Sequence, residues 1–197
     1  GPEMFHGGKD DYLALNATVQ SVTAKGGKVV LTNVPGFVPS AGFGAGNYST
    51  PTERMQMWKL ASYYMLRERA GNIGKAYFSP DFNIGQDLSF ETKDWLKAYE
   101  TDVGTPSSVM VTYMTGAAPS CTARNYAIFG RKYTKGYVLV RAKDDFSCTD
   151  YNNSGVTVTL SQPLKLLRGD GTLSAPMSSI VIRNGEAAVL LQYKNRL

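Results

Sequence analysis

The single histidine of this 197-residue sequence stands beside a carboxylate, in the segment PEMFHGG that holds Glu3 and His6. A carboxylate is able to act as a general acid or base, and a nearby imidazole is able to bind a substrate hydroxyl. We therefore take Glu3 as the candidate catalytic acid/base and His6 as a candidate substrate-binding residue. The alternative is that this segment is only a flexible N-terminus.

Two aromatic residues and one aspartate form a second set of candidate binding residues. The Gly-, Pro- and Ser-rich stretch 35–50 contains Phe43 and Tyr48, and Asp81 follows the apolar segment 76–79. Flat aromatic faces pack on the CH faces of sugar rings, and a carboxylate accepts hydrogen bonds from sugar hydroxyls. We interpret Phe43, Tyr48 and Asp81 as candidate sugar-binding residues. In the alternative interpretation, buried phenylalanines pin a glycine-rich loop and Asp81 belongs to a turn or a helix cap.

Other common chemistries lack the residues they need. One His and two Cys are too few for a multi-histidine metal site or a Cys-ligated zinc cluster. Asp144, Asp145 and Asp150 do not follow the D-x-D-x-D-G order of a calcium loop, so a solvated turn is favoured. The G-x-G-x-G run at 42–46 lacks the context of a phosphate-binding loop, and no G-x-S-x-G elbow occurs. We predict no metal and no cofactor.

The cysteines and glycosylation sequons favour a secreted protein. Cys121 and Cys148 lie in polar stretches outside any C-x-x-C motif, and a disulfide between two loop ends is the favoured interpretation over two free thiols. Asn47 and Asn152 begin N-x-S/T sequons and are the candidate glycosylation sites, whereas the sequon at Asn16 falls within a predicted helix. We therefore expect a secreted or extracellular location.

The charge is mildly basic and scattered along the chain. Lys and Arg number 21 against 16 Asp and Glu, a net charge of +5, and only 19% of residues are charged. Basic residues such as Arg131, Lys132 and Arg168 alternate with apolar ones, which indicates a solvated sheet face rather than a nucleic-acid interface. No apolar run reaches the roughly 18–20 residues of a membrane span. We expect neither a nucleic-acid partner nor a membrane span.

A helix followed at once by a strand opens the chain. Residues 11–25 carry a loosely helical apolar pattern, and Gly26 and Gly27 are typical of a helix end. The apolar segment 28–33 follows directly as a short strand. This order predicts the helix-to-strand half of a βαβ unit.

The clearest local signal is the start of the next helix at Thr50. Thr50 is able to cap, Pro51 suits the first helical position, and Glu53 is placed to reach back to the cap amide. The helix is expected to run to about residue 70. A strand over 76–79 and a helix over 90–100 are predicted after it.

From Gly104 the apolar pattern changes to a period of two. Seven short strands separated by turn signals predict an antiparallel sandwich. The predicted strands are 108–114, 125–133, 137–142, 156–160, 164–167, 180–183 and 187–193.

Five segments carry a family resemblance: GGKVVLTNV at 26–34, TERMQMWKLASYYMLRERAGNIGKAYFSPDF at 52–82, YETDVGTPSS at 99–108, YAIFGRKYTKGYVLVRAK at 126–143 and GEAAVLLQ at 185–192. They resemble the C-terminal end of secreted glycoside-hydrolase-like proteins built as a (β/α)-barrel followed by a small β-sandwich. The sequence departs from that pattern at Arg141 and Ala142, where Asn-Pro is usual.

The resemblance implies a fold class of α/β plus all-β. A partial (β/α)-barrel-type layer would occupy residues 1–103, and a C-terminal antiparallel β-sandwich would occupy 104–197. About 100 residues cannot close an eight-stranded barrel, which takes about 250. Glycosidases usually need two carboxylates. Glu3 is the residue able to match one of them, and the second would lie outside this chain.

Two function classes follow. In the first, the chain is the C-terminal portion of a secreted glycoside-hydrolase-like protein that acts on or binds polysaccharide. Catalysis, if present, would be glycoside hydrolysis and would need a partner chain or a missing N-terminal segment. In the second, the chain is a non-catalytic extracellular structural or adhesive subunit that assembles through its β-rich surfaces. In both classes, the predicted parallel strands are of a kind that is buried on both faces, so another chain or segment must cover them.

Overall fold

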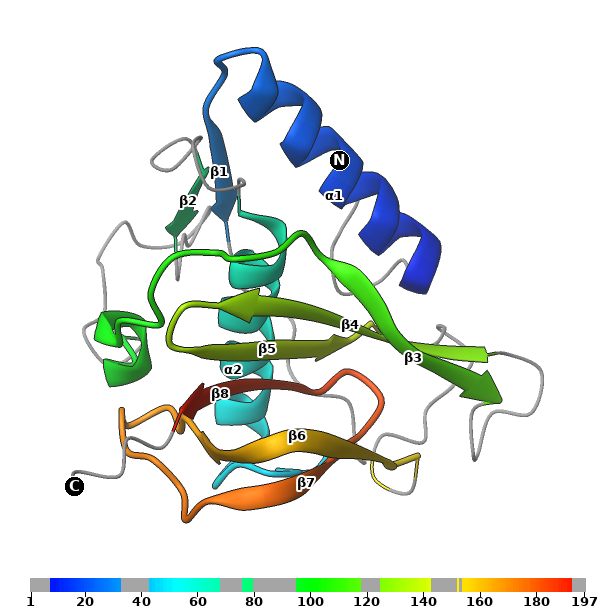
Figure 1. Cartoon of the computed structure of the whole chain (residues 1–197), viewed down its shortest axis with the longest axis vertical. Coiled ribbons are helices and arrows are strands. Elements are labelled where there is room, and N and C mark those ends of the chain that lie inside the picture. Colours follow the sequence, from blue (N-terminus) through cyan, green and yellow to red (C-terminus); the bar gives the residue numbers. More distant parts are fainter. Residues whose placement is uncertain are drawn as a thin grey trace, which may run out of the picture.

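Six strands of the C-terminal half form one curled antiparallel sheet, and the helix over residues 51–66 packs across one of its faces (Figure 1). The computed structural model describes residues 8–32, 43–67, 76–79, 95–117, 125–142, 152 and 154–192. In chain order the elements are α1 (Gly8–Ala24), β1 (Val29–Thr32), α2 (Pro51–Leu66), β2 (Ala76–Ser79), the 3₁₀ helix η2 (Lys97–Glu100), β3 (Val111–Ala117), β4 (Asn125–Tyr133), β5 (Gly136–Arg141), β6 (Val156–Leu166), β7 (Met177–Ile182) and β8 (Ala187–Gln192).

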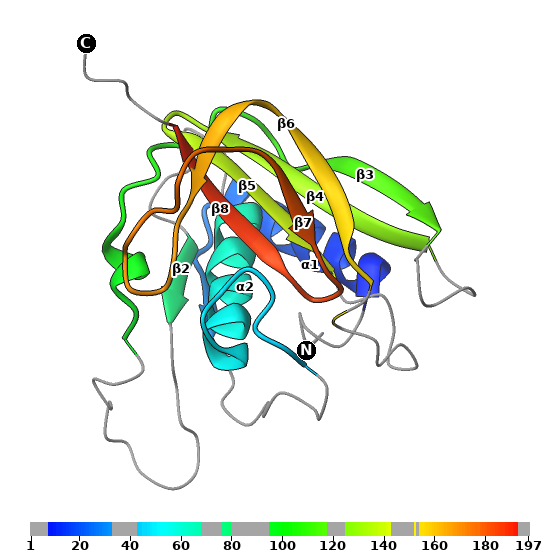
Figure 2. The ribbon, with the colours of Figure 1, turned by 90° about the horizontal axis from the view of Figure 1, so that it is seen from below.

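The strand order in this sheet is β3-β4-β5-β8-β6-β7, so β8 inserts between β5 and β6. The sheet curls enough to bring its two ends together, as Figure 2 shows. Tyr113 on β3 donates through its hydroxyl to the carbonyl of Thr159 on β6, at 3.2 Å. Tyr113 is placed to do so because β3 has a register irregularity between Thr112 and Met114, which leaves it without a partner in the ladder to β4.

Both faces of the curled sheet are buried in its middle. On one face Phe129 of β4 stacks on Tyr12 of α1, with ring centroids 5.1 Å apart. Successive strand residues point to opposite faces, so Ile128 lies on the other face, and it is completely buried there. Val158 and Ile182, on strands at the far end of the sheet, are also completely buried. The curl therefore closes a second apolar core on the face away from the helices.

The helix α2 begins where its sequence predicts and ends at Leu66, four residues before the predicted end near residue 70. Thr50 is the cap and accepts a hydrogen bond from the amide of Glu53 at 3.0 Å, and Pro51 takes the first helical position. The helix ends at Leu66, because Arg67 has an extended ψ of 155°. Ten of its residues are buried: Arg54, Met55, Met57, Trp58, Leu60, Ala61, Ser62, Tyr64, Met65 and Leu66. The helix is covered on several sides by β4, β5, β8, α1 and β2.

A separate two-stranded parallel sheet pairs β1 with β2, in the register Val29 to Ala76 through Thr32 to Ser79. The two strands are connected through α2, so β1–α2–β2 is a parallel crossover unit. The strands predicted over 28–33 and 76–79 are confirmed.

The predicted fold class is wrong. The described part of the chain is mostly antiparallel sheet with two α-helices, which does not fit a (β/α)-barrel layer. The helix α2 packs on β5 and β8 of the antiparallel sheet, whereas barrel helices cover a ring of parallel strands. The predicted sandwich is also replaced, because the six strands join in one curled sheet rather than two facing ones.

Several local predictions are corrected as well. The strands predicted over 156–160 and 164–167 form the single strand β6, which passes Pro163 at a register irregularity between Thr159 and Leu164. Within the helix predicted over 90–100, the described residues 95–100 hold only the four-residue helix η2. The carboxylate of Glu53 does not bind the cap amide: it accepts from the amide of Ser49 at 2.8 Å and from that of Gly169 at 2.7 Å.

Candidate functional site

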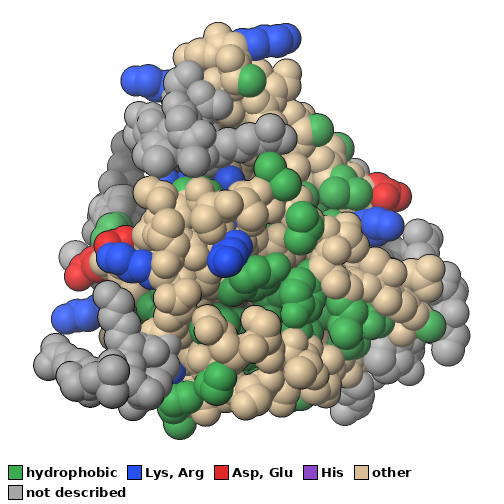
Figure 3. All heavy atoms as spheres, viewed as in Figure 1, with side chains coloured by type: hydrophobic (Ala, Val, Ile, Leu, Met, Phe, Trp, Pro, Cys, Tyr) green, Lys and Arg blue, Asp and Glu red, His purple; other side chains and the backbone are tan. Residues whose placement is uncertain are grey.

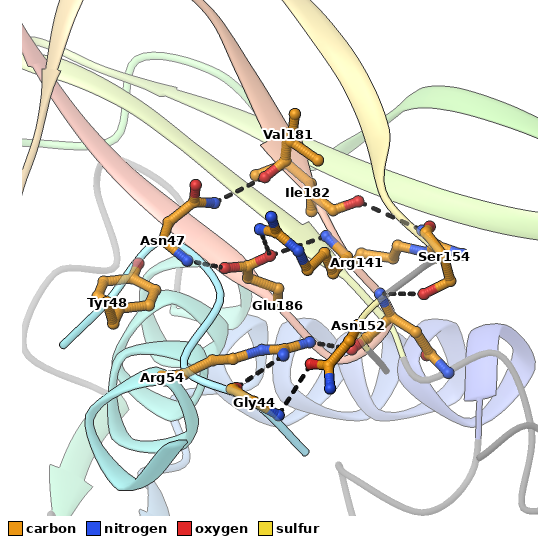
Figure 4. Close-up of polar contacts among 12 residues, drawn as sticks. Gly44, Asn47, Tyr48, Arg54, Arg141, Asn152, Ser154, Val181, Ile182 and Glu186 are labelled. Carbon is orange, nitrogen blue, oxygen red and sulfur yellow. Dashed lines mark hydrogen bonds and ion pairs between the residues drawn. The ribbon is translucent and has the colours of Figure 1, made fainter. Parts of the chain in front are cut away.

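A buried cluster of charged side chains lies at the N-terminal end of α2 (Figure 4). We call it the arginine cluster: Arg54 from α2, Arg141 from β5, and Arg183 and Glu186 from the turn between β7 and β8. Arg54, Arg141 and Glu186 are completely buried. Charged side chains are seldom fully buried without partners, so the contacts of this cluster decide what it does.

Glu186 lies at the centre of the arginine cluster. Its Oε1 accepts from the amide of Asn47 at 2.7 Å, and its Oε2 accepts from the amide of Arg183 at 2.9 Å and from the Arg183 guanidinium at 3.3 Å. Gly46 passes so close that a Cβ there would stand 2.2 Å from Glu186 Oε1. Gly46 also has a φ of +60°, so both its space and its conformation require glycine. Glu186 thereby fixes the path of the segment before α2.

The arginines of the cluster donate mainly to backbone carbonyls. Arg54 donates to the carbonyl oxygens of Gly44 at 2.9 Å and Asn184 at 2.6 Å. Arg141 donates to the carbonyls of Ser154 and Ile182 on the concave side of the sheet. Burial lowers the pKa of the Arg54 guanidinium to about 10, and the negative charge of Glu186 works against this shift.

This geometry makes the arginine cluster a clamp rather than a reaction centre. Both carboxylate oxygens of Glu186 accept backbone hydrogen bonds, which fits an anchoring role. The guanidinium groups bind the ends of segments that are distant in sequence. The cluster therefore joins the loop before α2, the end of β5 and the β7–β8 turn into one rigid unit.

A second clamp holds the C-terminal end of α2. Arg131 on β4 is 1% exposed, and its Nη1 donates to the carbonyls of Tyr64 and Met65, each at 3.1 Å, and to that of Arg67. Tyr133 donates to the same Tyr64 carbonyl at 2.6 Å. The last carbonyls of a helix have no partner within the helix, and a cation there also complements the helix dipole. β4 thus supplies the cap that α2 lacks in its own sequence.

Phe43 and Tyr48, predicted to bind sugar, lie inside the protein. Phe43 is 4% exposed and stands under the Arg54 guanidinium at 4.2 Å from ring centroid to Cζ, and Tyr48 is 5% exposed. The Tyr48 hydroxyl donates to the carbonyl of Ala187 at 2.7 Å. Burial raises the pKa of Tyr48 well above its ordinary value, and Glu186 adds to the rise. Their described role is packing, and a sugar-binding role stays a prediction.

The two predicted glycosylation sites flank the arginine cluster. Asn47 is half-buried, and its Nδ2 donates to the carbonyl of Val181 at 2.6 Å. Asn152 is exposed, and its Oδ1 accepts from the amide of Gly44 at 2.9 Å. Asn16 lies in α1, as its sequence context predicts. Whether any of these residues carries a glycan stays a prediction.

Five further predicted site residues fall outside the described residues. These are the candidate catalytic Glu3, the candidate binding residues His6 and Asp81, and the candidate disulfide partners Cys121 and Cys148. The structure brings together only Phe43, Tyr48, Asn47 and Asn152 of the predicted set, around the loop before α2.

The residues of both clamps were missed by the sequence analysis. Arg131 was interpreted as part of a solvated sheet face, and this is wrong because it is buried. Arg141, which is also buried, was noted only as a departure from the family pattern. A signal was present for Arg131, since it stands at a period of two from Ala127 and Phe129 and so shares their buried face. Glu186 follows Gly185 in a turn and gives no comparable signal.

Two aromatic groups of the described chain remain at the surface. Trp95 is 44% exposed and stands next to η2, and Tyr113 is 39% exposed on the edge strand β3. The Tyr113 ring contacts Tyr137 of β5 edge-on, with centroids 5.7 Å apart. Figure 3 shows hydrophobic side chains gathered over the middle of the sheet on the face away from α2.

Comparisons with protein-family models, curated protein sequences and solved structures find no match for this chain. Within the described ranges, no cluster of three or more His, Cys, Asp or Glu side chains is placed to hold a metal ion. The helices of the described chain are also too short or too polar to cross a bilayer.

Proposed function

We propose that this chain is a non-catalytic bracing part of a secreted polysaccharide-acting protein. Its curled sheet would hold the parallel strand pair β1–β2 in place, and a further segment or a partner chain would complete that pair and supply the catalytic carboxylates. The five family-like sequence segments support the substrate class. The structural support comes from how α2 joins the two sheets.

The observation that carries the proposal is the parallel pair itself. Among the described residues, β1 and β2 are four residues each, form a two-stranded sheet and are connected through α2. Parallel strands occur almost only in larger sheets that are covered on both faces. A two-stranded parallel sheet held against a rigid helix is therefore a place where additional strands are able to pair and extend the sheet.

The contacts of α2 explain how the bracing would work. Arg54 fixes its first turn, the Trp58 indole donates to the Arg141 carbonyl at 2.9 Å in its middle, and Arg131 caps its last turn. Three levels of hydrogen bonds to the antiparallel sheet leave the helix little freedom to shift. β1 and β2, which α2 connects, would therefore also be held in place.

Two carboxylates of the described residues, Glu53 and Glu186, are bound by backbone amides, which supports a non-catalytic role. Glu186 is completely buried with both oxygens in backbone hydrogen bonds, and the two oxygens of Glu53 bind the amides of Ser49 and Gly169. Glycoside hydrolysis needs two carboxyl groups facing one sugar, roughly 5–9 Å apart. These two side chains serve the fold instead.

The test measures binding and hydrolysis on the same secreted protein. Affinity electrophoresis through gels containing xylan, laminarin, galactomannan or hydroxyethyl cellulose reports binding, and an assay for new reducing ends reports hydrolysis. We expect retardation by at least one polysaccharide and no reducing ends above a bovine albumin control. Free mobility in all four gels contradicts the polysaccharide part, and hydrolysis by this chain alone contradicts the non-catalytic part.

One observation favours assembly as a second candidate function. β3 is an edge strand, the run 105–123 carries no charged residue, and Val111 on it is 44% exposed. Edge strands are usually protected by charges, so a neutral edge permits a second copy of the chain to add its own β3. Sedimentation velocity would show a concentration-dependent dimer that Val111→Lys abolishes. Leu173→Lys, at a residue 43% exposed on the β6–β7 turn, is the control, and a monomer at all concentrations contradicts this candidate.

A further inference from the structure

We propose that Trp95, together with Lys97 and Glu100 of the adjoining helix η2, is a platform that binds one sugar ring of a polysaccharide. This inference rests on the proposed function and names the site through which it would act. It concerns a segment that the sequence analysis did not select.

Trp95 differs sharply from the other tryptophan of the chain. Trp58 is 1% exposed in the core, whereas Trp95 is 44% exposed. Tryptophan is among the largest apolar side chains, and leaving it in water forfeits a large hydrophobic gain. An exposed indole of this size is the surface that a pyranose ring covers with its CH face.

The Trp95 ring is held in one orientation before any ligand arrives. Its Nε1 donates to Glu100 Oε1 at 2.9 Å, and the Tyr99 ring meets it edge-on, at 85° with centroids 5.4 Å apart. A side chain that is already fixed loses less conformational entropy when a ligand binds. The platform is therefore preorganised by two neighbours on the same short helix.

The segment that carries the platform is anchored to the large sheet. The amide of Ala98, which is completely buried, donates to the carbonyl of Gly169 at 3.1 Å in the β6–β7 connection. Gly171 packs so close to Lys97 that a Cβ there would stand 3.2 Å from the Lys97 Cβ. Figures 1 and 2 agree in placing η2, drawn in bright green, beside the β6–β7 connection, drawn in orange.

The charges around Trp95 favour a neutral, hydroxyl-rich ligand. Lys97 and Glu100 are both exposed on η2, and Glu100 contacts the Trp95 indole, so the segment offers one side chain that donates and one that accepts hydrogen bonds. Asp102, which follows η2, pairs with Lys135, and Asp170 lies in the β6–β7 connection that packs against η2; both aspartates are exposed. This mixture lacks the cationic excess that a phosphate-bearing or nucleic-acid ligand requires. Figure 3 shows hydrophobic, acidic and basic side chains together at the edge over η2.

The two tryptophans make a direct test possible. Acrylamide reaches an exposed indole and is excluded from a buried one, so the quenchable part of the fluorescence reports Trp95. The probe is an oligosaccharide of the polysaccharide that retards the protein most strongly in affinity electrophoresis. We expect the probe to protect the quenchable fraction, and Trp95→Ala to weaken retardation at least tenfold. Trp95→Tyr should restore part of it, because it keeps an aromatic face.

The matched control is Tyr113→Ala, which removes the other aromatic side chain that is exposed among the described residues and should leave retardation unchanged. Urea midpoints of each variant check that folding is intact. If the parent protein binds and Trp95→Ala binds equally well, the platform is overturned while the proposed function stands. If the parent protein binds none of the four polysaccharides, both are overturned.

Discussion

The indole of Trp58 on α2 donates a hydrogen bond to the carbonyl oxygen of Arg141, the last residue of β5, at 2.9 Å. The guanidinium of the same Arg141 turns to the concave side of the sheet and binds the carbonyls of Ser154 and Ile182. Arg141 is therefore held by the helix through its backbone and by the far strands through its side chain. This residue links the two apolar cores of the curled sheet.

Replacing Trp58 with Phe tests that link. The variant keeps an aromatic ring in the core but removes the hydrogen bond that the indole donates to the buried Arg141 carbonyl. Removing one partner of a buried hydrogen bond costs about 1–3 kcal/mol. We expect the free energy of unfolding, from urea titrations followed by far-UV circular dichroism, to fall by that amount.

The control for this variant is Trp95→Phe, at the exposed tryptophan. Substitutions at exposed positions usually change stability by less than about 0.5 kcal/mol. Equal urea midpoints for Trp58→Phe and the parent protein would show that the hydrogen bond contributes nothing.

Arg131→Met tests the cap that β4 provides to α2. The variant removes the donor to the Tyr64, Met65 and Arg67 carbonyls and keeps an apolar stem of similar length. Hydrogen bonds to charged groups contribute about 1.5–3 kcal/mol, so we expect a loss in this range. Hydrogen exchange should also become faster at the amides of the last turn of α2.

The neighbouring residue offers a matched control for Arg131. Lys132 is exposed on the opposite face of β4, and Lys132→Met removes one positive charge without touching α2. If both variants destabilise the protein equally, the effect is one of net charge, and the capping role of Arg131 is excluded.

Local elements were predictable because their signals are local. β4 has the predicted bounds 125–133, and Thr50 and Pro51 start α2 where the capping pattern places them. Each of these two elements depends on interactions among residues close together in the sequence. Period-two alternation and N-cap side chains are therefore both recognisable without knowing the fold.

The curl of the sheet and both clamps depend on distant contacts. Arg54 binds the carbonyl of Asn184, 130 residues away, and Tyr113 crosses to Thr159 only because β3 is irregular at that point. Arginine on a strand signals a solvated face when its partners are unknown. A buried arginine is stable only where carbonyls converge on it, and that convergence is a property of the folded chain.

Gly46→Ala tests the close approach of the loop to Glu186. A left-handed φ costs a non-glycine residue about 1–2 kcal/mol. The added methyl group would also meet Glu186 Oε1 at 2.2 Å, and overpacking typically costs a further 1–3 kcal/mol or so. Gly26→Ala is the matched control, because Gly26 has a φ of +86° and nothing within 4 Å of its Cβ position. The thermal unfolding midpoint of Gly46→Ala should lie clearly below that of Gly26→Ala. Equal decreases in the two midpoints would contradict the contact.

Stability should fall steeply above pH 10, because the pKa values of four buried tyrosines are raised. Burial raises the pKa of Tyr12, Tyr48 and Tyr133 above the ordinary value and raises the pKa of Tyr64 to about 12. Below pH 10 these tyrosines are protonated in both the folded and the unfolded chain, so their contribution is constant. Above it the unfolded chain loses protons that the folded chain keeps, and unfolding becomes more favourable.

Each of these four tyrosines removes about 1.4 kcal/mol of stability per pH unit between its unfolded-state and folded-state pKa values. Arg54 offsets the loss from one tyrosine. Its pKa is lower in the folded chain, so above pH 10 the unfolded chain still holds a proton that the folded chain has lost, and this favours the folded state. The net slope should be about 4 kcal/mol per pH unit just above pH 10, measured from urea midpoints at successive pH values. Tyr133→Phe should reduce this slope by about 1.4 kcal/mol per pH unit, since it removes one buried phenol. A slope that is unchanged in this variant would mean that Tyr133 ionises in the folded protein as readily as in the unfolded one.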